Sequence, residues 1–223
     1  MYIKIYIKES FFMKIKIGFT LAEVLITLGI IGIVAAMSIP SLINKVQEIT
    51  FKSKLKKSYS LLSQTVKLMI ADDNAYMGKC RINDSKCLGE MFGKYMKFVN
   101  AEAGTSYFKG CWEDSYTPNI SEPKYCATTA DGIVYLFDME WEKPHQNDEG
   151  DTVDVIAYIL VDVNGTKLPN KYGIDRFIFH MNSNDEVSLK FGGKLKGCSY
   201  GKTNSPWANM NCAYEVLTGN KDE

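Results

Sequence analysis

The chain has 223 residues, with 26 basic and 26 acidic side chains and a hydrophobic fraction of 46%. This length suffices for one globular domain with its own core plus an appended element, and the ordinary composition excludes wholesale disorder. A net charge of zero gives no electrostatic reason to expect nucleic acid as a main partner. The chain contains no GxSxG or HExxH motif and no paired-histidine site, so the sequence does not predict an enzyme.

The first predicted element is a long helix whose N-terminal half is apolar. Residues 19–43 contain one charged side chain, Glu23. A helix from Phe19 to Ile39 would be about 31 Å long, which is enough to cross the hydrocarbon core of a membrane. An ordinary secretory signal has a shorter apolar region, and a plain anchor has no use for a carboxylate, which is costly to place in lipid. Glu23 therefore indicates a more specific function for this segment.

The residues around Glu23 resemble the prepilin processing site that type IV pilins share with type II secretion pseudopilins. The resemblance rests on a basic leader, the run Gly-Phe-Thr-Leu at 18–21, Glu23 and the long apolar helix. It implies that a prepilin peptidase cuts between Gly18 and Phe19 on the cytoplasmic side of the membrane and methylates the new amino group of Phe19. The removal of residues 1–18 would leave a mildly acidic chain.

The resemblance also implies roles in assembly for Glu23, Gly32 and Pro40. Glu23 would pair with the amino group of Phe19 in a neighbouring subunit, because two paired charges escape the cost that each bears alone away from water. The alternative is that Glu23 only reaches the membrane surface. Gly32 and Pro40 weaken a helix, and the stretch between them would be the one that loses helicity in a filament. Alternatively, the glycines allow close packing of helices in the membrane.

The helical pattern is predicted to continue beyond the membrane as an amphipathic segment over residues 44–72. Apolar side chains recur there at three- and four-residue steps: Leu55, Tyr59, Leu62, Val66, Met69 and Ile70. Five lysines also follow the apolar run and outnumber those of the leader, so charge alone leaves the topology open. The processing site and the cysteines instead predict an N-terminus in the cytoplasm and a C-terminal head outside it. The leader has two alternative starts, Met1 and Met13.

The remainder, residues 73–223, is predicted to be a globular head that contains one more helix and several strands. The helix is expected over 86–99, where apolar residues keep helical spacing. Strands rich in β-branched and aromatic residues are expected over 132–139, 152–163, 175–182 and 187–191, with a hairpin turn at 182–185. Short links between such strands favour an antiparallel sheet. The predicted fold class is therefore α+β, with the long N-terminal helix packed on the sheet, which is the pilin architecture.

Six cysteines lie in this head, and disulfides are the first interpretation of an even number of cysteines in an exported domain. Their proximity in the sequence favours three pairs, namely Cys80–Cys87, Cys111–Cys126 and Cys198–Cys212. A metal site is the alternative, but the chain has no CxxC pair, and its histidines lie far from any cysteine pair in the sequence.

A loop near the C-terminus contains oxygen ligands and glycines in a pattern that suits calcium. The candidate ligands are Asp162, Asn164 and Asp175. Major pseudopilins carry a calcium loop in this region, so the resemblance also points to calcium, although the spacing is not that of an EF-hand. The alternative is a turn between two strands, which Asp, Asn and Gly favour in any case.

The sequence therefore predicts a pseudopilin or minor pilin, a structural subunit of a type II secretion or type IV pilus-like filament. Its partners would be the prepilin peptidase, other subunits through the N-terminal helix and, indirectly, an inner-membrane platform protein and a secretion ATPase. It would cross the inner membrane once. The alternative function is an anchored binding or adhesin module, which could use aromatic side chains of the head: Trp112, Tyr116, Trp141 and Trp207.

Overall fold

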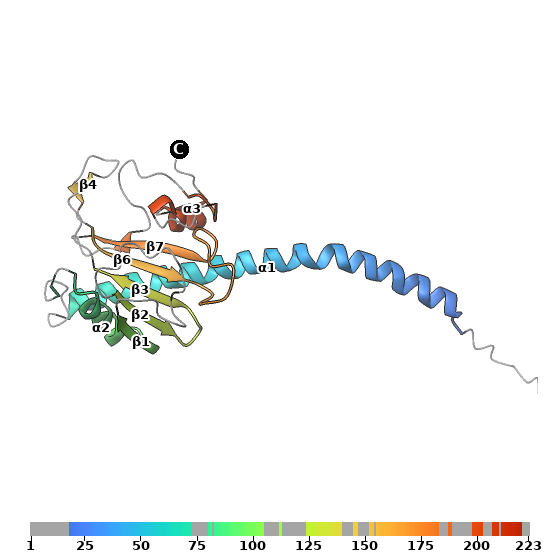
Figure 1. The fold of residues 1–223 in the computed structure, drawn as a ribbon, viewed down its shortest axis with the longest axis horizontal. Helices are drawn as coiled ribbons and strands as arrows, with labels where there is room; N and C mark the ends of the chain where they lie inside the picture. Colours follow the sequence, from blue (N-terminus) through green and yellow to red (C-terminus); the bar gives the residue numbers. More distant parts are fainter. Residues whose placement is uncertain are drawn as a thin grey trace, which may run out of the picture. The chain divides into compact units, whose positions relative to one another are not determined.

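The computed structural model describes residues 18–72, 80–81, 83–104, 112, 124–139, 145–146, 152–153, 155–182, 187–188, 198–202, 207–209 and 211–219. The chain divides into two compact units, Met1–Lys45 and Val46–Glu223. Both predicted components of an α+β pilin-like fold are present, namely a long N-terminal helix and an antiparallel sheet (Figure 1).

The helices are α1 (Leu21–Ala71), α2 (Ser85–Tyr95) and α3 (Cys212–Thr218), with a short 3-10 turn at Trp207–Asn209. The strands are β1 (Phe98–Gly104), β2 (Lys124–Thr129), β3 (Val134–Asp138), β4 (His145–Gln146), β5 (Thr152–Val153), β6 (Val155–Asp162), β7 (Arg176–Asn182) and β8 (Val187–Ser188). Six of them form one sheet in the order β1-β2-β3-β6-β7-β8, and β4 pairs with β5. All of these strand pairs are antiparallel.

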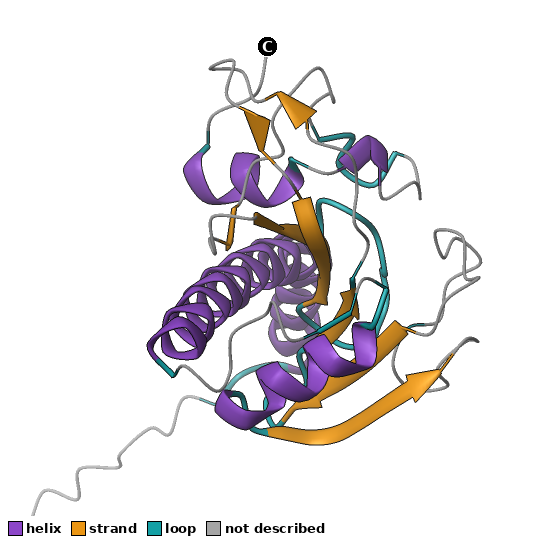
Figure 2. Cartoon of the chain, turned by 90° about the vertical axis from the view of Figure 1, so that its left-hand side faces the viewer, coloured by secondary structure: helices purple, strands orange, loops and turns teal. Residues whose placement is uncertain are grey.

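The main sheet buries apolar side chains on both faces. In β3, Tyr135 and Phe137 belong to the larger core, which the second half of α1 and helix α2 also line. The ring centres of Phe137 and of Phe92 in α2 lie 4.9 Å apart. The alternate residues Val134 and Leu136 belong to a smaller core on the other side of the sheet. Burial on both faces explains why this strand has a continuous apolar run instead of alternation. Figure 2 shows α1 and α2 beside the strands.

The buried face of α1 is rotated from the predicted one. Leu62 is fully buried and marks the centre of the face, but Ile70 is 44% exposed. Ile70 lies about 80° from Leu62 around the helix, whereas the buried Thr65 lies about 60° from Leu62 in the other direction. The prediction for Ile70 was wrong because polar Ser58 and Thr65 occupy buried positions that an apolar pattern does not count.

The second helix ends earlier than predicted. It stops at Tyr95, and the backbone of Met96 is extended, with φ −99° and ψ 127°. The Met96 N–H closes the last turn on the Phe92 carbonyl at 2.8 Å. Phe98 and Val99 then lie in β1 instead of the helix, and Phe98 packs against the larger core. Strands β1 and β2 and helix α3 are further elements that the sequence did not predict.

Four predicted strand regions contain observed strands, namely β3, β5 with β6, β7, and β8. The predicted hairpin turn lies mostly outside the described residues, although the strands on either side of it, β7 and β8, do pair.

Two predicted disulfides, Cys80–Cys87 and Cys198–Cys212, are present in the structure. Cys126 is also disulfide-bonded, and its predicted partner, Cys111, lies outside the described residues. The Cys198–Cys212 bond packs on Gly173, where an added Cβ would lie 2.5 Å from one sulfur and 2.8 Å from the other. Gly173 also has a φ of 81°, which favours glycine. This disulfide links two parts of the C-terminal region and packs against the loop that precedes β7.

Candidate processing and assembly segment

The start of α1 is fixed by a reciprocal hydrogen-bond arrangement between Thr20 and Glu23. The Glu23 carboxylate accepts the Thr20 N–H at 2.8 Å and the Thr20 hydroxyl at 2.7 Å. The Glu23 N–H in turn donates to the Thr20 hydroxyl oxygen at 3.2 Å. This is a capping box, in which a threonine before the helix and a glutamate three residues later satisfy backbone donors that have no partner within the helix.

The capping box places the predicted cleavage site immediately outside the helix. Gly18, Phe19 and Thr20 precede α1, and all three residues are exposed. An added Cβ at Gly18 would have no atom within 4 Å. A peptidase needs an accessible backbone around the bond that it cuts, and residues 18–20 are exposed and lie outside the helix.

The first half of α1 exposes its apolar side chains. Leu25, Leu28, Ile31 and Met37 are each more than 60% exposed, and Phe19, just before the helix, is 88% exposed. In the part of the chain that the structure describes, α1 is the one helix long and apolar enough to cross a membrane, with a mean hydropathy of 2.2 in its most apolar window. The helix therefore has the properties of a single membrane anchor.

Gly32 and Pro40 both lie inside α1, which is helical on either side of the proline. Pro40 cannot donate the backbone hydrogen bond of its position, and an added Cβ at Gly32 would have no neighbour within 4 Å. The structure thus places the two predicted weak points eight residues apart in one helix. A change of conformation between them in a filament stays a prediction.

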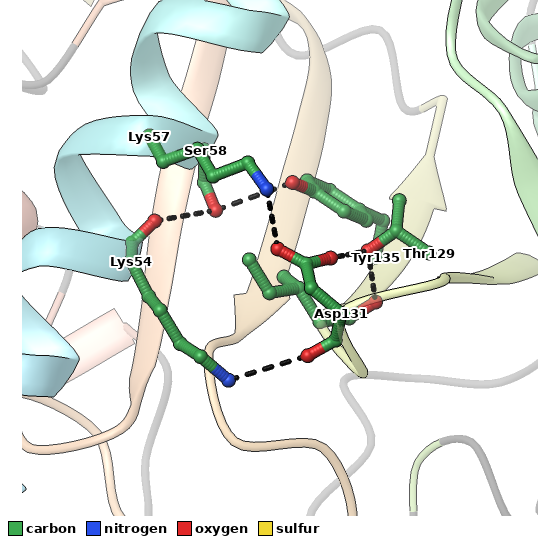
Figure 3. Close-up of polar contacts among 7 residues, drawn as sticks. Lys54, Lys57, Ser58, Thr129, Asp131 and Tyr135 are labelled. Atoms are coloured by element: carbon green, nitrogen blue, oxygen red, sulfur yellow. Dashed lines mark hydrogen bonds and ion pairs between the residues drawn. The ribbon is translucent and has the colours of Figure 1, made fainter.

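A set of polar contacts fastens the latter part of α1 to the turn between β2 and β3 (Figure 3). The Lys57 ammonium lies 2.6 Å from Oδ2 of Asp131, and Lys54 donates to the Asp131 backbone carbonyl at 3.3 Å. The Thr129 hydroxyl donates to the other Asp131 oxygen at 2.7 Å. Burial raises the pKa of Asp131, but the hydrogen bonds from Lys57 and Thr129 outweigh it and leave that pKa below its ordinary value.

A buried hydroxyl pair lies beside this contact. The Tyr135 hydroxyl donates to Ser58 at 3.2 Å, and the Ser58 hydroxyl donates to the Lys54 carbonyl at 3.0 Å. Burial raises the pKa of Tyr135 to about 12, so the phenol is neutral at physiological pH. Figure 3 shows that these side chains reach from helix and strand toward one another. We name the contacts of Lys54, Lys57 and Ser58 with Asp131 and Tyr135 the helix clamp.

The predicted calcium ligands lie together in the loop between β6 and β7, but their carboxylates already have other partners. Asp162 accepts a hydrogen bond from Nε of Arg176 at 2.9 Å, and its second oxygen accepts the Asn164 N–H at 3.2 Å. Asp175 accepts backbone N–H groups of the same loop at 2.8 and 2.6 Å. Arg176, the residue that supplies the positive charge here, was not among the predicted site residues.

Some of these contacts had a signal in the sequence and others had none. The capping box is a Thr-x-x-Glu pattern before an apolar run, which is a known helix-start signal that the sequence analysis did not use. By contrast, Lys57 and Asp131 are 74 residues apart, and no periodicity relates them. Their contact follows from the packing of the helix on the sheet.

Comparison with known proteins bears on the N-terminal segment. Residues 13–39 match the family model of the prokaryotic N-terminal methylation motif. No curated protein and no solved structure matches the chain significantly. The matched range includes Gly18, Phe19, Glu23 and Gly32. The methylation motif and the α+β fold together support a relationship to the type IV pilin-like and pseudopilin family.

Proposed function

We propose that the chain is a structural subunit, a pseudopilin or minor pilin, of a type II secretion or type IV pilus-like filament. The observation that carries the proposal is the methylation motif at the start of an exposed apolar segment, residues 19–43, whose one charged side chain is Glu23. Apolar surface of this kind needs lipid or other helices around it. The motif favours a structural role over an enzymatic one.

The proposed cycle starts with insertion into the inner membrane, with the N-terminus in the cytoplasm. A prepilin peptidase then cuts after Gly18 and methylates Phe19. The apolar helices of processed subunits pack side by side in the filament, and a secretion ATPase acting through a platform protein drives their extrusion. The head, which the helix clamp fastens to α1, follows the helix and forms the filament surface.

Processing can be tested by mass spectrometry of the membrane-extracted protein. We expect the N-terminal peptide to begin at a methylated Phe19, and a Gly18→Val variant to keep its leader. A mature terminus at another residue, or none, would contradict the proposal.

Assembly can be tested separately from capping because glutamine preserves one function of Glu23 and removes the other. A Glu23→Gln variant can keep the capping box but loses the charge that would pair with the Phe19 amino group. We expect normal cleavage, with subunit cross-linking and filament formation reduced at least about tenfold, which corresponds to about 1.4 kcal/mol per subunit contact.

The controls for this experiment separate capping from charge. A Thr20→Ala variant removes the cap but leaves the carboxylate, and Glu48→Gln neutralises an exposed carboxylate further along α1. Both variants are expected to assemble. Assembly of Glu23→Gln at the level of the unmodified chain would refute charge pairing.

The alternative function, an anchored binding module, loses one of its candidate contacts. Trp112 is 1% exposed and belongs to the smaller core, so it is not available to a ligand. Tyr116 and Trp141, and the side chain of Trp207, lie outside the described residues. A Glu23→Gln variant that is anchored in the membrane and still binds its ligand at the level of the unmodified chain would favour this alternative.

A further inference from the structure

The loop between β6 and β7 is organised around a buried arginine. Arg176 is at the start of β7, and the side chains of Arg176 and Asp162 are each 1% exposed. The guanidinium carbon lies 4.4 Å from the centre of the Trp112 ring, within the range of a cation–π interaction. The positive charge is therefore held between a carboxylate and the face of a buried aromatic ring.

The carboxylate oxygens of this loop are all hydrogen-bonded. Asp162 accepts from Arg176 and from the Asn164 N–H, and Asp175 accepts from the N–H groups of Asn170 and Lys171. Calcium takes six to eight oxygen ligands at roughly 2.3–2.6 Å. The described residues contain no group of three or more His, Cys, Asp or Glu side chains that could hold a metal. The two carboxylates are therefore engaged with donors of the chain, and of the three predicted ligands only the Asn164 side-chain oxygen has no hydrogen-bond donor in the described part of the chain.

The charge of the cluster points in the same direction. With both Asp162 and Asp175 ionised, these two carboxylates and the Arg176 guanidinium carry a net charge of −1. A divalent cation beside the guanidinium would turn this into a buried positive charge, which is unfavourable in a site that excludes water.

The choice of arginine is itself informative. The chain has only two arginines, Arg81 and Arg176, among 26 basic residues. A guanidinium can donate to a carboxylate and stack on an aromatic ring at the same time, whereas an ammonium is compact and strongly hydrated. Position 176 therefore uses properties that lysine, the common basic residue of this chain, does not have.

We propose that the Arg176 guanidinium is the resident cation of the loop over residues 163–175, so that this loop folds without a divalent metal. Arg176 neutralises the carboxylate of Asp162, and Asp162 in turn holds the Asn164 N–H at the start of the loop. The Cys198–Cys212 disulfide packs on Gly173 of the same loop. The stability of this end of the head then depends on Arg176 and not on calcium in the medium.

The first test uses the full chain in detergent, with thermal unfolding measured in millimolar calcium and in EGTA. We expect the same midpoint in both conditions. Terbium is a second probe, because its luminescence would be sensitised by Trp112 if it bound at Asp162. We expect no sensitised emission. A calcium-dependent rise in midpoint, or terbium emission that disappears in Asp162→Asn, would overturn the proposal.

The second test asks whether the positive charge itself is needed. Arg176→Met leaves Asp162 buried without its cation, so the midpoint should fall by several degrees. The double variant Asp162→Asn with Arg176→Met removes both charges, and we expect it to regain at least half of that loss. Arg81→Met changes an exposed arginine and should have no effect.

The double variant keeps the test decisive even if the single variant does not fold. A folded double variant whose midpoint is closer to that of the unmodified chain supports the resident-cation role. A double variant that is no more stable than Arg176→Met would show that Arg176 contributes packing alone, and would overturn the proposal.

Discussion

Both halves of α1 present large apolar side chains, but their surroundings are opposite. In residues 21–43 the large apolar side chains are exposed, with Leu28 at 61% and Ile31 at 63%. In the second half, Leu55 and Leu62 are fully buried against the sheet and α2. The second half finds its partner within the chain, whereas the first half needs lipid or other helices to cover it.

This difference shows how one helix can belong to two environments. In the first half, the side-chain hydrogen bonds are local: Glu23 bonds to Thr20, and the hydroxyls of Thr27 and Ser38 donate to carbonyls of the same helix. The second half is fastened by the helix clamp and by its buried apolar side chains, Leu55, Leu62, Val66 and Met69, which we call the stripe. The helix clamp and the stripe therefore hold the head to the second half of α1, which is continuous in sequence with the segment that is proposed to assemble.

The largest effect is expected from emptying the centre of the buried stripe. Leu62→Ala removes a fully buried side chain and should lower the free energy of unfolding of the head by about 3–4 kcal/mol. Chemical unfolding of the full chain in detergent, followed by tryptophan fluorescence, measures this change.

The control for this substitution lies on the same half of the helix. Leu68 is 53% exposed, so Leu68→Ala should change the free energy of unfolding by less than about 0.5 kcal/mol. Equal effects of the two substitutions would show that the stripe is not buried as the structure has it.

The stripe also shows how far the sequence predicted the fold. Periodicity identified Leu55, Leu62, Val66 and Met69 correctly, because apolar side chains at helical spacing need a covered face. It placed Ile70 wrongly, since hydrogen-bonded serine and threonine can occupy buried positions that an apolar count ignores. Ser58 is such a case, with its hydroxyl bonded to Lys54 and Tyr135.

Elements with weak local signals were missed for a related reason. Strand β1 contains alanine, glycine, asparagine and glutamate, which are depleted in strands, and it forms by pairing with β2. The functional residues show the same difference. The processing motif is a local pattern that can be recognised in the sequence. The contact of Arg176 with Trp112 joins residues 64 positions apart and depends on tertiary packing.

A smaller effect is expected from a charge in the exposed half. Leu28→Asp places a carboxylate at the middle of the membrane-spanning segment and should make insertion less favourable by about 3 kcal/mol. The fraction of heads protected from protease inside inverted membrane vesicles should fall, while the unfolding of the head stays unchanged. Leu28→Ala, which keeps the segment apolar, is expected to insert normally.

This variant separates the two halves most directly. If Leu28→Asp destabilised the head as much as Leu62→Ala, the first half of α1 would have a partner within the chain. The contrast between the two halves would then be wrong.

The smallest effect concerns the helix clamp. The pair of Lys57 with Asp131 is partly exposed, with side chains 60% and 32% accessible, so Asp131→Asn should lower the free energy of unfolding by less than about 1 kcal/mol. The Asn variant keeps the shape of the side chain and removes its charge. Lys57→Gln should have an effect of similar size, and the double variant should add little to either, as expected for two residues of one contact.

The dependence of this effect on pH distinguishes the charge from the hydrogen bonds. The pKa of Asp131 is lower in the folded chain than its ordinary value of 3.8, so the unfolded chain binds the proton more readily. The stabilisation is therefore complete above that ordinary value and decreases as the pH falls through the folded pKa. The difference between the unmodified chain and Asp131→Asn should shrink over the same range, as measured by unfolding at a series of pH values. A difference that stays constant down to the lowest pH at which the head folds would assign the contact to its hydrogen bonds alone. The stripe would then be the dominant link between the second half of α1 and the sheet.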